Sequence, residues 1–433
     1  MFETIRNAWK IEDLKKKLLY TLLILALVRI GAAIPVPFLT TAGLQSMVSS
    51  SGGLFSYLDL MTGGSFSQST LFALSISPYI TSSIVVQLLT VAIPYLENLA
   101  KEGEEGRKKI NKITRWTTLG LALLQAYGYM RLLASQSAIT TYDAGWQNFF
   151  VRLVIVMCFT AGSMLVVFLG ERIDEKGIGN GISMILFVGI ASRAGAVAKT
   201  MYEYVYFATL GVIRYWFYIP IIVVLFLFIV VVIIIMTNAE RRIPVQYAKR
   251  VVGRKQYGGQ STYLPIKVNM SGVLPVIFAS TLLAIPTTIL AFLPNLSADS
   301  FWYKFLSVFQ TNTLLYAVLY FVLIIAFNYF YLSIQYNPVE ISNNLRKNSG
   351  GVPGIRPGKP TSDYIARIVN KTTFLGGLFL SFIAILPIIL GMITGMNISL
   401  GGTSVIILVG VALDTVRSLE SQMMMRHYKG FLE

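Results

Sequence analysis

The sequence predicts an all-α integral membrane protein of about ten transmembrane helices, and three observations support this prediction. Of the 433 residues, 55% are hydrophobic and only 13% are charged, whereas soluble domains carry about 25% charged residues. Residues 218–236 contain no charged side chain, and roughly 20 apolar residues are enough to cross a hydrocarbon core. Similar apolar runs recur along the chain. Most of the molecule is therefore expected to lie in a membrane.

The ten predicted spans fall into two groups of five. As long apolar runs, they are expected near residues 18–37, 71–93, 116–133, 149–170 and 181–198, and then near 218–236, 273–293, 314–334, 374–391 and 403–419. An odd number of spans in each group makes the two halves inverted and pseudo-symmetric. Many membrane transport proteins have this design, with a path at the interface of the halves.

Positive charge is distributed unevenly around these spans. With the N-terminus inside, 29 of the 36 Lys and Arg residues fall in cytoplasmic segments and six in outer loops and their flanks, while Arg29 lies within the first span. Cytoplasmic loops of membrane proteins carry such an excess. Both termini are therefore expected to be cytoplasmic. Topology also explains most of the net charge of +16 without nucleic-acid binding.

The spans divide the chain into segments. Residues 1–17 are expected to form a cytoplasmic amphipathic N-terminus that lacks a signal-peptide cleavage site, and residues 18–198 form the N-terminal half. The remaining segments are an outer loop with span six at 199–237, a cytoplasmic basic loop at 238–268, spans seven and eight at 269–336, a second cytoplasmic basic loop at 337–371, spans nine and ten at 372–419, and a cytoplasmic tail at 420–433.

Two cytoplasmic loops carry more positive charge than topology requires. Both are long and contain Gly, Pro and Asn turn signals. Their basic residues include Arg250, Arg254 and Lys255 in the first loop, and Arg346, Lys347, Arg356 and Lys359 in the second. Basic loops that project from one face are typical of docking sites for an anionic partner.

The second element of each half is irregular. In the first half, the apolar segment 52–60 is too short to span and a turn at 61–70 follows it, so the full span is expected from residue 71. The short segment is either an amphipathic helix on the outer face or a re-entrant element, because non-helical backbone at membrane depth must be buried in protein or line an aqueous cavity. In the second half, the span is expected to be interrupted by three prolines, Pro275, Pro286 and Pro294.

Few residues have the chemistry of a catalytic or metal site. The chain has a single cysteine, Cys158, which excludes an internal disulfide. It also has a single histidine, His427. These counts argue against a Cys/His metal cluster and against a Ser–His or Cys–His pair. The ionisable residues within spans are Arg29, Arg193 and Asp414. We expect Arg29 to be paired inside the bundle and the other two to reach an interface. No catalytic residue, metal ion or cofactor is expected, and the chain is not predicted to be an enzyme.

Two glycine-rich stretches resemble nucleotide-binding loops but fail in detail. GIGNGIS (177–183) lacks the third glycine at the required spacing. GIRPGKPT (354–361) has Pro353 in place of the first glycine and Pro360 after the lysine. The sequence thus shows no energy source of its own, and a driven process would need a partner to supply one.

Six stretches, in order along nearly the whole chain, match one known family. They are LFALSISPYITSSIVVQLLT (71–90), KEGEEGRKKI (101–110), GERIDEKGIGNGISMI (170–185), STYLPIKVNMSGVLPVIFAS (261–280), NPVEISNNLRKNSGGVPGIRPGKPT (337–361) and GGTSVIILVG (401–410). On these stretches the sequence resembles the SecY family of bacterial protein-conducting channels. The resemblance implies an hourglass of two five-helix halves with a short re-entrant plug helix, and a lateral gate between the second and seventh spans.

The resemblance also implies roles for particular residues. The implied pore ring is Ile80, Ile84, Leu186, Ile190, Ile277 and Ile407, with Leu186 in place of the usual isoleucine. The implied plug includes Leu54, Phe55, Tyr57, Leu58, Leu60, Met61, Gly63 and Gly64. The implied lateral gate includes Thr81, Ser82, Ser83, Gln87, Ile277, Ser280 and Thr281. Without the resemblance, the ring residues would be interpreted as ordinary packing or lipid-facing side chains.

A function follows as an expectation from the same resemblance. It implies the central pore-forming subunit of the Sec translocase, which passes unfolded, signal-bearing polypeptides across the bacterial plasma membrane and releases transmembrane segments sideways into lipid. The implied partners are SecE, SecG, the SecA ATPase and the ribosome, whose RNA would contact the basic loops. Arg356 is the first expected contact, followed by Arg250, Arg254 and Lys255. The alternatives are a small-solute transporter, which should show a polar midplane site that the sequence lacks, and a membrane-embedded enzyme.

Overall fold

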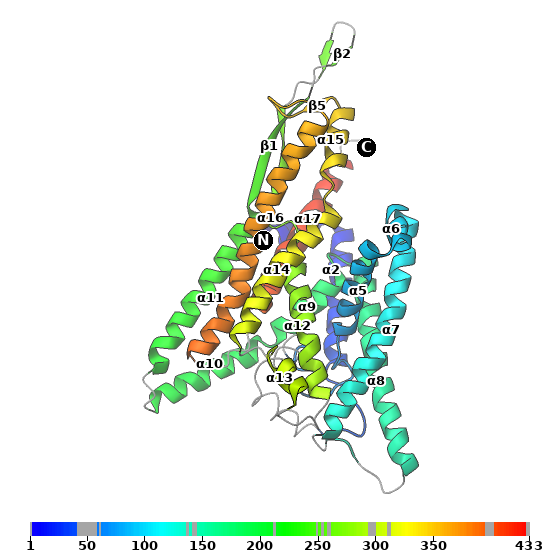
Figure 1. The fold of residues 1–433 in the computed structure, drawn as a ribbon, viewed down its shortest axis with the longest axis vertical. Helices are drawn as coiled ribbons and strands as arrows, with labels where there is room; N and C mark the ends of the chain where they lie inside the picture. Colours follow the sequence, from blue (N-terminus) through cyan, green and yellow to red (C-terminus); the bar gives the residue numbers. More distant parts are fainter. Residues whose placement is uncertain are drawn as a thin grey trace.

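The computed structural model is an elongated bundle of helices with its strands confined to one end (Figure 1). The structure describes residues 2–40, 59, 62–135, 138–140, 145–210, 214–247, 250–252, 255–257, 261–292, 300–309, 313–394 and 402–429. The predicted fold class, a helical membrane protein, is confirmed.

The helices of the N-terminal half follow the predicted order. They are α1 (Phe2–Lys10), α2 (Glu12–Gly31), α5 (Ser77–Ala92), α6 (Pro94–Lys101), α7 (Glu104–Ser135), α8 (Gly145–Lys176), α9 (Gly181–Ser192) and α10 (Ala194–Thr209). Helices α5 and α6 meet at an angle of 99°, at Pro94, whose ring fits the first turn of a new helix but not the interior of a continuous one.

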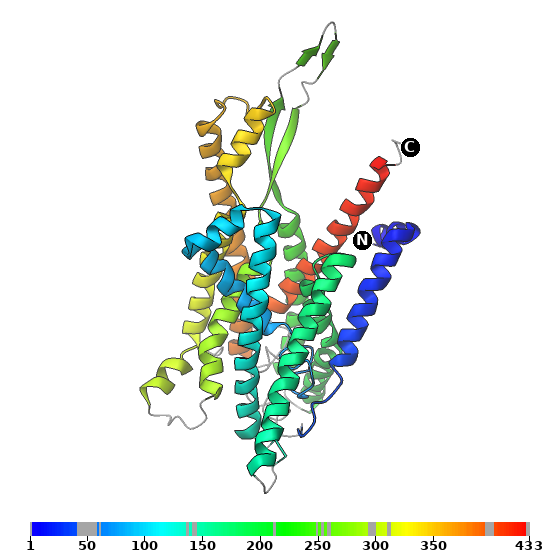
Figure 2. The same cartoon turned by 90° about the vertical axis from the view of Figure 1, so that its right-hand side faces the viewer.

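The helices of the C-terminal half are α11 (Arg214–Asn238), α12 (Leu274–Phe292), α13 (Phe301–Ser307), α14 (Leu314–Gln335), α15 (Pro338–Lys347), α16 (Lys359–Thr394) and α17 (Gly402–Lys429). The last helix packs against α1 (Figure 2), where Thr4 Oγ1 donates to Glu420 Oε1 at 3.2 Å. The two ends of the described chain therefore lie together.

A helix overlaps each of the ten predicted spans. Within the described residues, six helical segments are long and apolar enough to cross a membrane, and the bent pair α5–α6 makes a seventh. Helix α2 falls outside this group because it contains Lys15, Lys16, Lys17 and Arg29. The apolar part of α12 is short, Leu274–Thr287. The ten-span prediction is consistent with this arrangement.

The predicted spans differ from the helices in several places. Helix α2 ends at Gly31 rather than at residue 37. Helix α5 begins at Ser77 rather than at residue 71, since the preceding residues form turns in which Ser75 has a φ of 46°. Helix α12 runs without interruption although Pro286 lies inside it. Membrane helices tolerate proline where neighbouring groups satisfy the freed carbonyl, and Pro275 occupies the first turn, where its missing N–H is not needed. Pro294 lies outside the described residues.

The strands, which the sequence did not predict, bring the two basic loops together. β1 (Glu240–Tyr247) pairs antiparallel with β4 (Ser261–Lys267), and its end also pairs with β5 (Gly350–Gly351) of the second loop. β2 (Arg250–Val252) and β3 (Lys255–Tyr257) form a separate two-stranded sheet beyond it (Figures 1 and 2).

Apolar burial stabilises this assembly of strands and helices. Residues from β1, β4, α14, α15, α16 and the segment after β5 share one buried cluster. Its members are Ile243, Val245, Ile266, Leu332, Leu345, Val352, Ile365 and Val369. The two loops therefore form a single folded body. We call it the basic platform and define it as the described residues of 240–267 and 338–369.

Replacing Ile243 by alanine is expected to loosen the basic platform by about 2–5 kcal/mol, because the side chain is buried and its loss leaves a cavity. Ile243 is only 1% exposed. Limited proteolysis of the purified protein should then cleave the platform faster, while the helical bundle stays resistant. Arg241→Ala, at an exposed position of the same strand, is the control. Equal cleavage of the two variants would contradict the prediction.

Candidate functional site

The glycine-rich stretch 177–183 starts α9 and sets its position. The Asn180 side chain caps the helix by accepting a hydrogen bond from the Ser183 N–H at 2.9 Å, and Asp174 Oδ1 accepts one from the Gly181 N–H at 2.7 Å. A Cβ at Gly181 would collide with the carbonyl oxygen of Gly170 in α8. These glycines therefore serve a helix start and a close contact between helices.

The six residues of the implied pore ring lie in two adjoining apolar clusters. Leu186 and Ile190 of α9, Ile277 of α12 and Ile407 of α17 belong to one buried cluster, which also includes residues of α2 and α8. Ile84 of α5 belongs to the neighbouring cluster of the C-terminal half, and Ile80 packs against both clusters. The structure thus brings together side chains from both halves of the chain. We call these six residues the apolar seam.

Most of the seam is buried in this structure. Five of its side chains are between 1% and 8% exposed, and Ile80 is half-buried. Helical periodicity explains the arrangement, because Ile80 and Ile84 are one turn apart, as are Leu186 and Ile190, so each pair shares a helix face. All six side chains are branched aliphatic groups that carry neither charge nor hydrogen-bonding atoms.

The described residues of the predicted plug, Asp59 and 62–64, lie beside the seam, and residues 62–69 form turns. Asp59, Thr62, Gly64 and most residues up to Thr70 are buried. Gly63 has a φ of 67°, and a Cβ at this position would lie 2.9 Å from the carbonyl oxygen of Gly189, the residue before Ile190. Leu54, Phe55, Tyr57, Leu58, Leu60 and Met61 lie outside the described residues.

Two arginines, Arg29 of α2 and Arg193 at the end of α9, flank the turn at Gly63 and Gly64. A Cβ at Gly63 would lie 2.6 Å from the guanidinium nitrogens of Arg29, and one at Gly64 would lie 3.3 Å from Nη1 of Arg193. Arg29 also donates to the Ser192 hydroxyl. Both glycines have positive φ, which side chains rarely adopt, so glycine permits both the turn and the close approach of the arginines.

Arg193 forms an ion pair that the sequence did not indicate. It was expected to reach an interface, but its guanidinium instead donates to Oδ2 of the buried Asp59. The two residues are 134 positions apart in the sequence. The one signal that could have identified Asp59 is its position as a charged residue within the apolar segment 52–60. Asp59 is therefore a site residue that the sequence analysis missed.

The residues of the implied lateral gate lie on α5 and α12, which contact each other. Their hydroxyls bond mainly within their own helices: Thr81 donates to the Ser77 carbonyl at 3.0 Å, and Thr281 to the Ile277 carbonyl at 2.8 Å. Ser280 likewise donates to the Ile277 carbonyl, at 2.9 Å, and Gln87 Nε2 donates to Ser83 Oγ at 3.3 Å.

Ser82 faces away from α12. Its hydroxyl is within hydrogen-bonding distance of the Thr114 carbonyl and of Thr117 Oγ1, both on α7, at 2.9 and 2.7 Å. On the other side of α5, Ile84 packs in the cluster that contains Val276, Phe278, Ala279 and Leu283 of α12. The described contact between α5 and α12 thus includes apolar packing.

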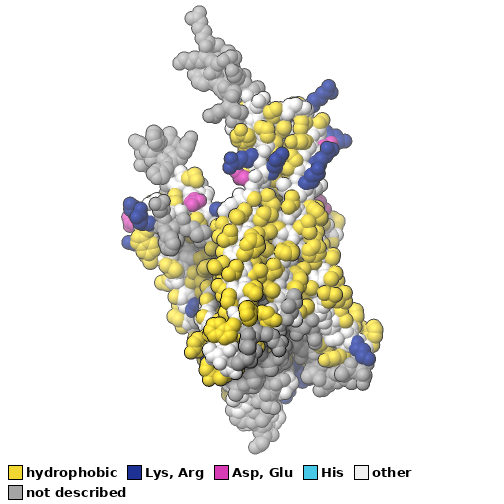
Figure 3. Space-filling model, turned by 90° about the vertical axis from the view of Figure 1, so that its left-hand side faces the viewer, with side chains coloured by type: hydrophobic (Ala, Val, Ile, Leu, Met, Phe, Trp, Pro, Cys, Tyr) yellow, Lys and Arg dark blue, Asp and Glu magenta, His cyan; other side chains and the backbone are white. Residues whose placement is uncertain are grey.

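Basic side chains project from the platform. Arg346 and Lys347 are exposed in the last turn of α15, and Lys359 is exposed where α16 begins. Arg356 is exposed in the turn between these helices, and its carbonyl accepts a hydrogen bond from Thr361 Oγ1 at 2.8 Å. Figure 3 shows Lys and Arg gathered near one end of the molecule, above a broad hydrophobic face. Arg250 and Lys255 lie in β2 and β3, and Arg254 is outside the described residues.

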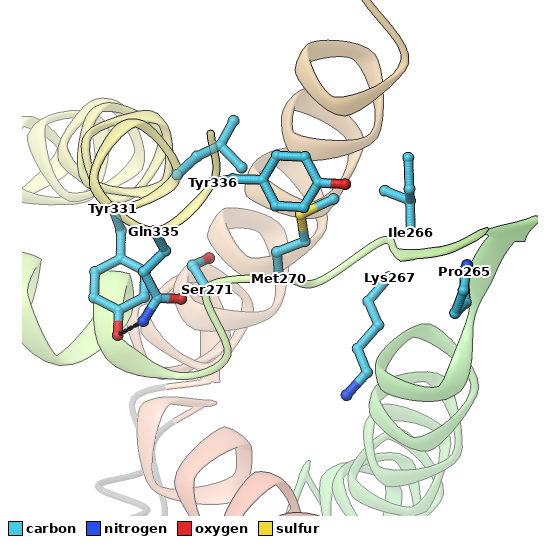
Figure 4. A pocket seen from close by; sticks show the side chains of 9 residues that line it. Pro265, Ile266, Lys267, Met270, Ser271, Tyr331, Gln335 and Tyr336 are labelled. Carbon is cyan, nitrogen blue, oxygen red and sulfur yellow. Dashed lines mark hydrogen bonds between the residues drawn. The ribbon is translucent and has the colours of Figure 1, made fainter. Parts of the chain in front are cut away.

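A hollow of about 250 Å³ lies where the platform meets the helices (Figure 4). It is lined by Pro265, Ile266, Lys267, Met270, Ser271, Tyr331, Leu332, Gln335 and Tyr336. Gln335 Nε2 donates to the Tyr331 hydroxyl at 2.7 Å. Among the described residues, no group of three or more His, Cys, Asp or Glu side chains is placed to hold a metal ion.

The fold and the seam define a class of protein: a helical membrane protein whose two halves meet at an apolar seam covered by a buried loop. Comparison with known proteins identifies its family. The SecY family model matches residues 70–416, and the chain belongs to the SecY family. It is 40% identical to the protein translocase subunit SecY of Streptomyces galbus over 100% of both chains. It is 42% identical to that of Corynebacterium glutamicum over 99% of both chains.

Solved structures share the fold at lower identity. A structure of a protein conducting channel matches with a TM-score of 0.63 at 18% identity, covering 94% of this chain and 92% of the other. Sec61 in a canine ribosome–channel complex from the endoplasmic reticulum matches with a TM-score of 0.60 at 18% identity, with the same coverage. At this level of identity the match supports the architecture.

Proposed function

We propose that this chain is the central pore-forming subunit of a protein translocase, which conducts unfolded polypeptides across the bacterial plasma membrane and releases transmembrane segments sideways into lipid. The observation that carries the proposal is the apolar seam, which is contributed by both halves and lies directly beside the buried loop at Gly63. The protein translocase subunits that match along the whole chain support the same activity.

In this function the apolar seam is the pore ring. A narrow ring of branched aliphatic side chains excludes water and raises a dewetting barrier to ions. The ring has no charge or hydrogen-bonding group to hold a passing peptide, so chains of different sequence can slide through it. The segment around Gly63 and Gly64 is the plug, which moves aside before a polypeptide passes.

The apolar contact between α5 and α12 is the lateral gate. An apolar segment can separate these two helices. Its own side chains then take the place of contacts between them, such as those that Ile84 makes. Its transfer to lipid gains roughly 25 cal/mol per Å² of apolar surface removed from water. Polar segments gain nothing from this route and continue through the ring.

The basic platform is the docking site for the partner that drives transport. Its exposed arginines and lysines suit an anionic surface, such as ribosomal RNA or an acidic face of the SecA ATPase. The excess of positive charge in these loops supports a cytoplasmic position for the platform and both termini. SecE and SecG are the expected accessory subunits.

Site-specific crosslinking tests the proposed path. Single cysteines would replace Ile84 and Ile277 in a Cys158→Ser background, and a stalled substrate with a signal sequence would be added together with SecA or a ribosome. We expect crosslinks at both positions that require both the signal and the driving partner. A cysteine at Ile155, which is buried in α8 in a different apolar cluster, is the control and should not crosslink.

Absence of crosslinks at Ile84 and Ile277, in protein that is folded and inserted, would overturn this function. Uptake of a small solute by the chain alone would then favour a secondary transporter.

A further inference from the structure

The Asp59 carboxylate is bonded on both of its oxygens. Oδ1 accepts a hydrogen bond from the Ser67 N–H at 2.8 Å, and Oδ2 accepts from the Arg193 guanidinium. The first bond closes the loop 59–67 on itself, and the Asp59 carbonyl closes it further by accepting from the Gly64 N–H at 2.8 Å. The second bond ties the loop to the end of α9. One side chain thus both shapes the loop and fastens it.

Arg193, the partner of Asp59, is held at the end of a helix. Arg193 is the C-cap residue of α9, directly after Ser192, and the same helix carries Leu186 and Ile190 of the apolar seam. The ion pair therefore connects the loop to the helix that contributes two of the six ring residues.

Burial makes this ion pair costly to break. The Asp59 side chain is 0% exposed and that of Arg193 is 27% exposed. A buried carboxylate that loses its partner is strongly destabilised, unlike a charge in an exposed pair. Asp59 therefore has to reach water when the pair opens. Displacement of the loop is therefore coupled to exposure of this one carboxylate.

We propose that the Asp59–Arg193 ion pair is a latch that sets how strong a signal sequence must be to open the channel. The proposal rests on the function proposed above. An incoming signal segment has to supply the free energy that breaks the pair, so segments with weaker apolar contacts fail to displace the plug. Asp59 and Arg193 are thus positioning residues that determine substrate stringency.

The test uses the chain reconstituted with its partner subunits and motor, and two substrates that differ only in an intact or a charge-interrupted signal sequence. The variants are Asp59→Asn, Arg193→Gln and their combination. Asparagine can keep the hydrogen bond from the Ser67 N–H through Oδ1 while removing the charge that faces Arg193. This variant therefore tests the ion pair separately from the hydrogen bond that shapes the loop. Asp59→Glu and Arg193→Lys retain the charges. Glu171→Gln removes a more exposed ion pair between α7 and α8, in which Arg115 Nε lies 2.7 Å from Glu171 Oε1.

We expect both neutral variants to raise transport of the defective substrate, relative to the intact one, by about tenfold or more. The double variant should add little to either single change, because both remove the same interaction. The charge-retaining variants and Glu171→Gln should stay close to the wild type.

An unchanged ratio in Asp59→Asn and Arg193→Gln, with normal transport of the intact substrate, would overturn the latch. An equal rise in Glu171→Gln would overturn it as well, by showing that any lost ion pair has the same effect. Failure of the wild-type chain to transport the intact substrate would instead overturn the proposed function, and the latch with it.

Discussion

Replacing Ile190 by serine is expected to make the resting protein conduct ions. Ile190 is 1% exposed and lies next to Gly189, against which the plug loop packs. Serine removes most of the aliphatic volume and adds a hydroxyl that binds water, so the dewetted stretch becomes shorter. Planar-bilayer recordings should show a rise in conductance of at least about tenfold, since each ~1.4 kcal/mol removed from a barrier is a factor of ten in rate.

The matched control for this change is Ile155→Ser. Ile155 is 0% exposed in α8, but it belongs to a different apolar cluster, with residues of α7 and the segment around Phe66. Both variants insert a hydroxyl into a packed interior, so a similar loss of stability is expected from each. Only Ile190→Ser, the change in the seam, should raise the ion conductance. Equal conductance in the two variants would show that the seam is ordinary helix packing.

Charge reversal at Arg356 is expected to abolish driven transport while leaving the resting seal intact. The side chain is exposed in a turn that the hydrogen bond from Thr361 holds in place, so Arg356→Glu should preserve the fold. A like charge placed against an anionic partner costs several kcal/mol. We therefore expect transport to fall by at least about tenfold, with a matching loss of motor or ribosome binding in sedimentation at low salt.

Lys108→Glu is the control for Arg356→Glu. Lys108 is equally exposed and basic but lies in α7, outside the platform, and loses only a surface pair with Glu104, which contributes about 0–1 kcal/mol. If this variant bound the partner as poorly as Arg356→Glu, net charge rather than the platform would govern docking.

The sequence predicted the helices well because each span is a local apolar pattern. The run 218–236 needs no other part of the chain to identify it, and α11 contains it. The start of α5 was predicted six residues too early, because residues 71–76 are as apolar as the helix that follows. Their turns depend on contacts elsewhere, such as the bond from the Leu71 N–H to the Ile34 carbonyl.

The strands of the platform and the Asp59–Arg193 pair were not predictable in the same way. β1 begins with Glu240, Arg241 and Arg242 and contains Pro244, and proline is confined to special positions in strands. Its pairing partners lie in β4 and in β5, about a hundred residues further on. Asp59 and Arg193 lie in separate segments whose local sequence patterns do not point to each other, and only the folded chain brings them together. The ring residues came from family resemblance, since aliphatic pairs one turn apart occur on most buried helices.

The β1–β4 strand pair is connected directly to the helices at its base. At its base, the Val268 N–H donates to the Ala239 carbonyl at 2.9 Å, and Arg417 of α17 holds the end of α11 through the Thr237 carbonyl at 2.9 Å. The connection to α12 is pinned where Ser271 donates to Asn328 of α14. The described chain from β4 thus leads directly into the first turn of α12, which carries Ile277. A partner that displaced the platform would therefore act on the apolar seam without touching it.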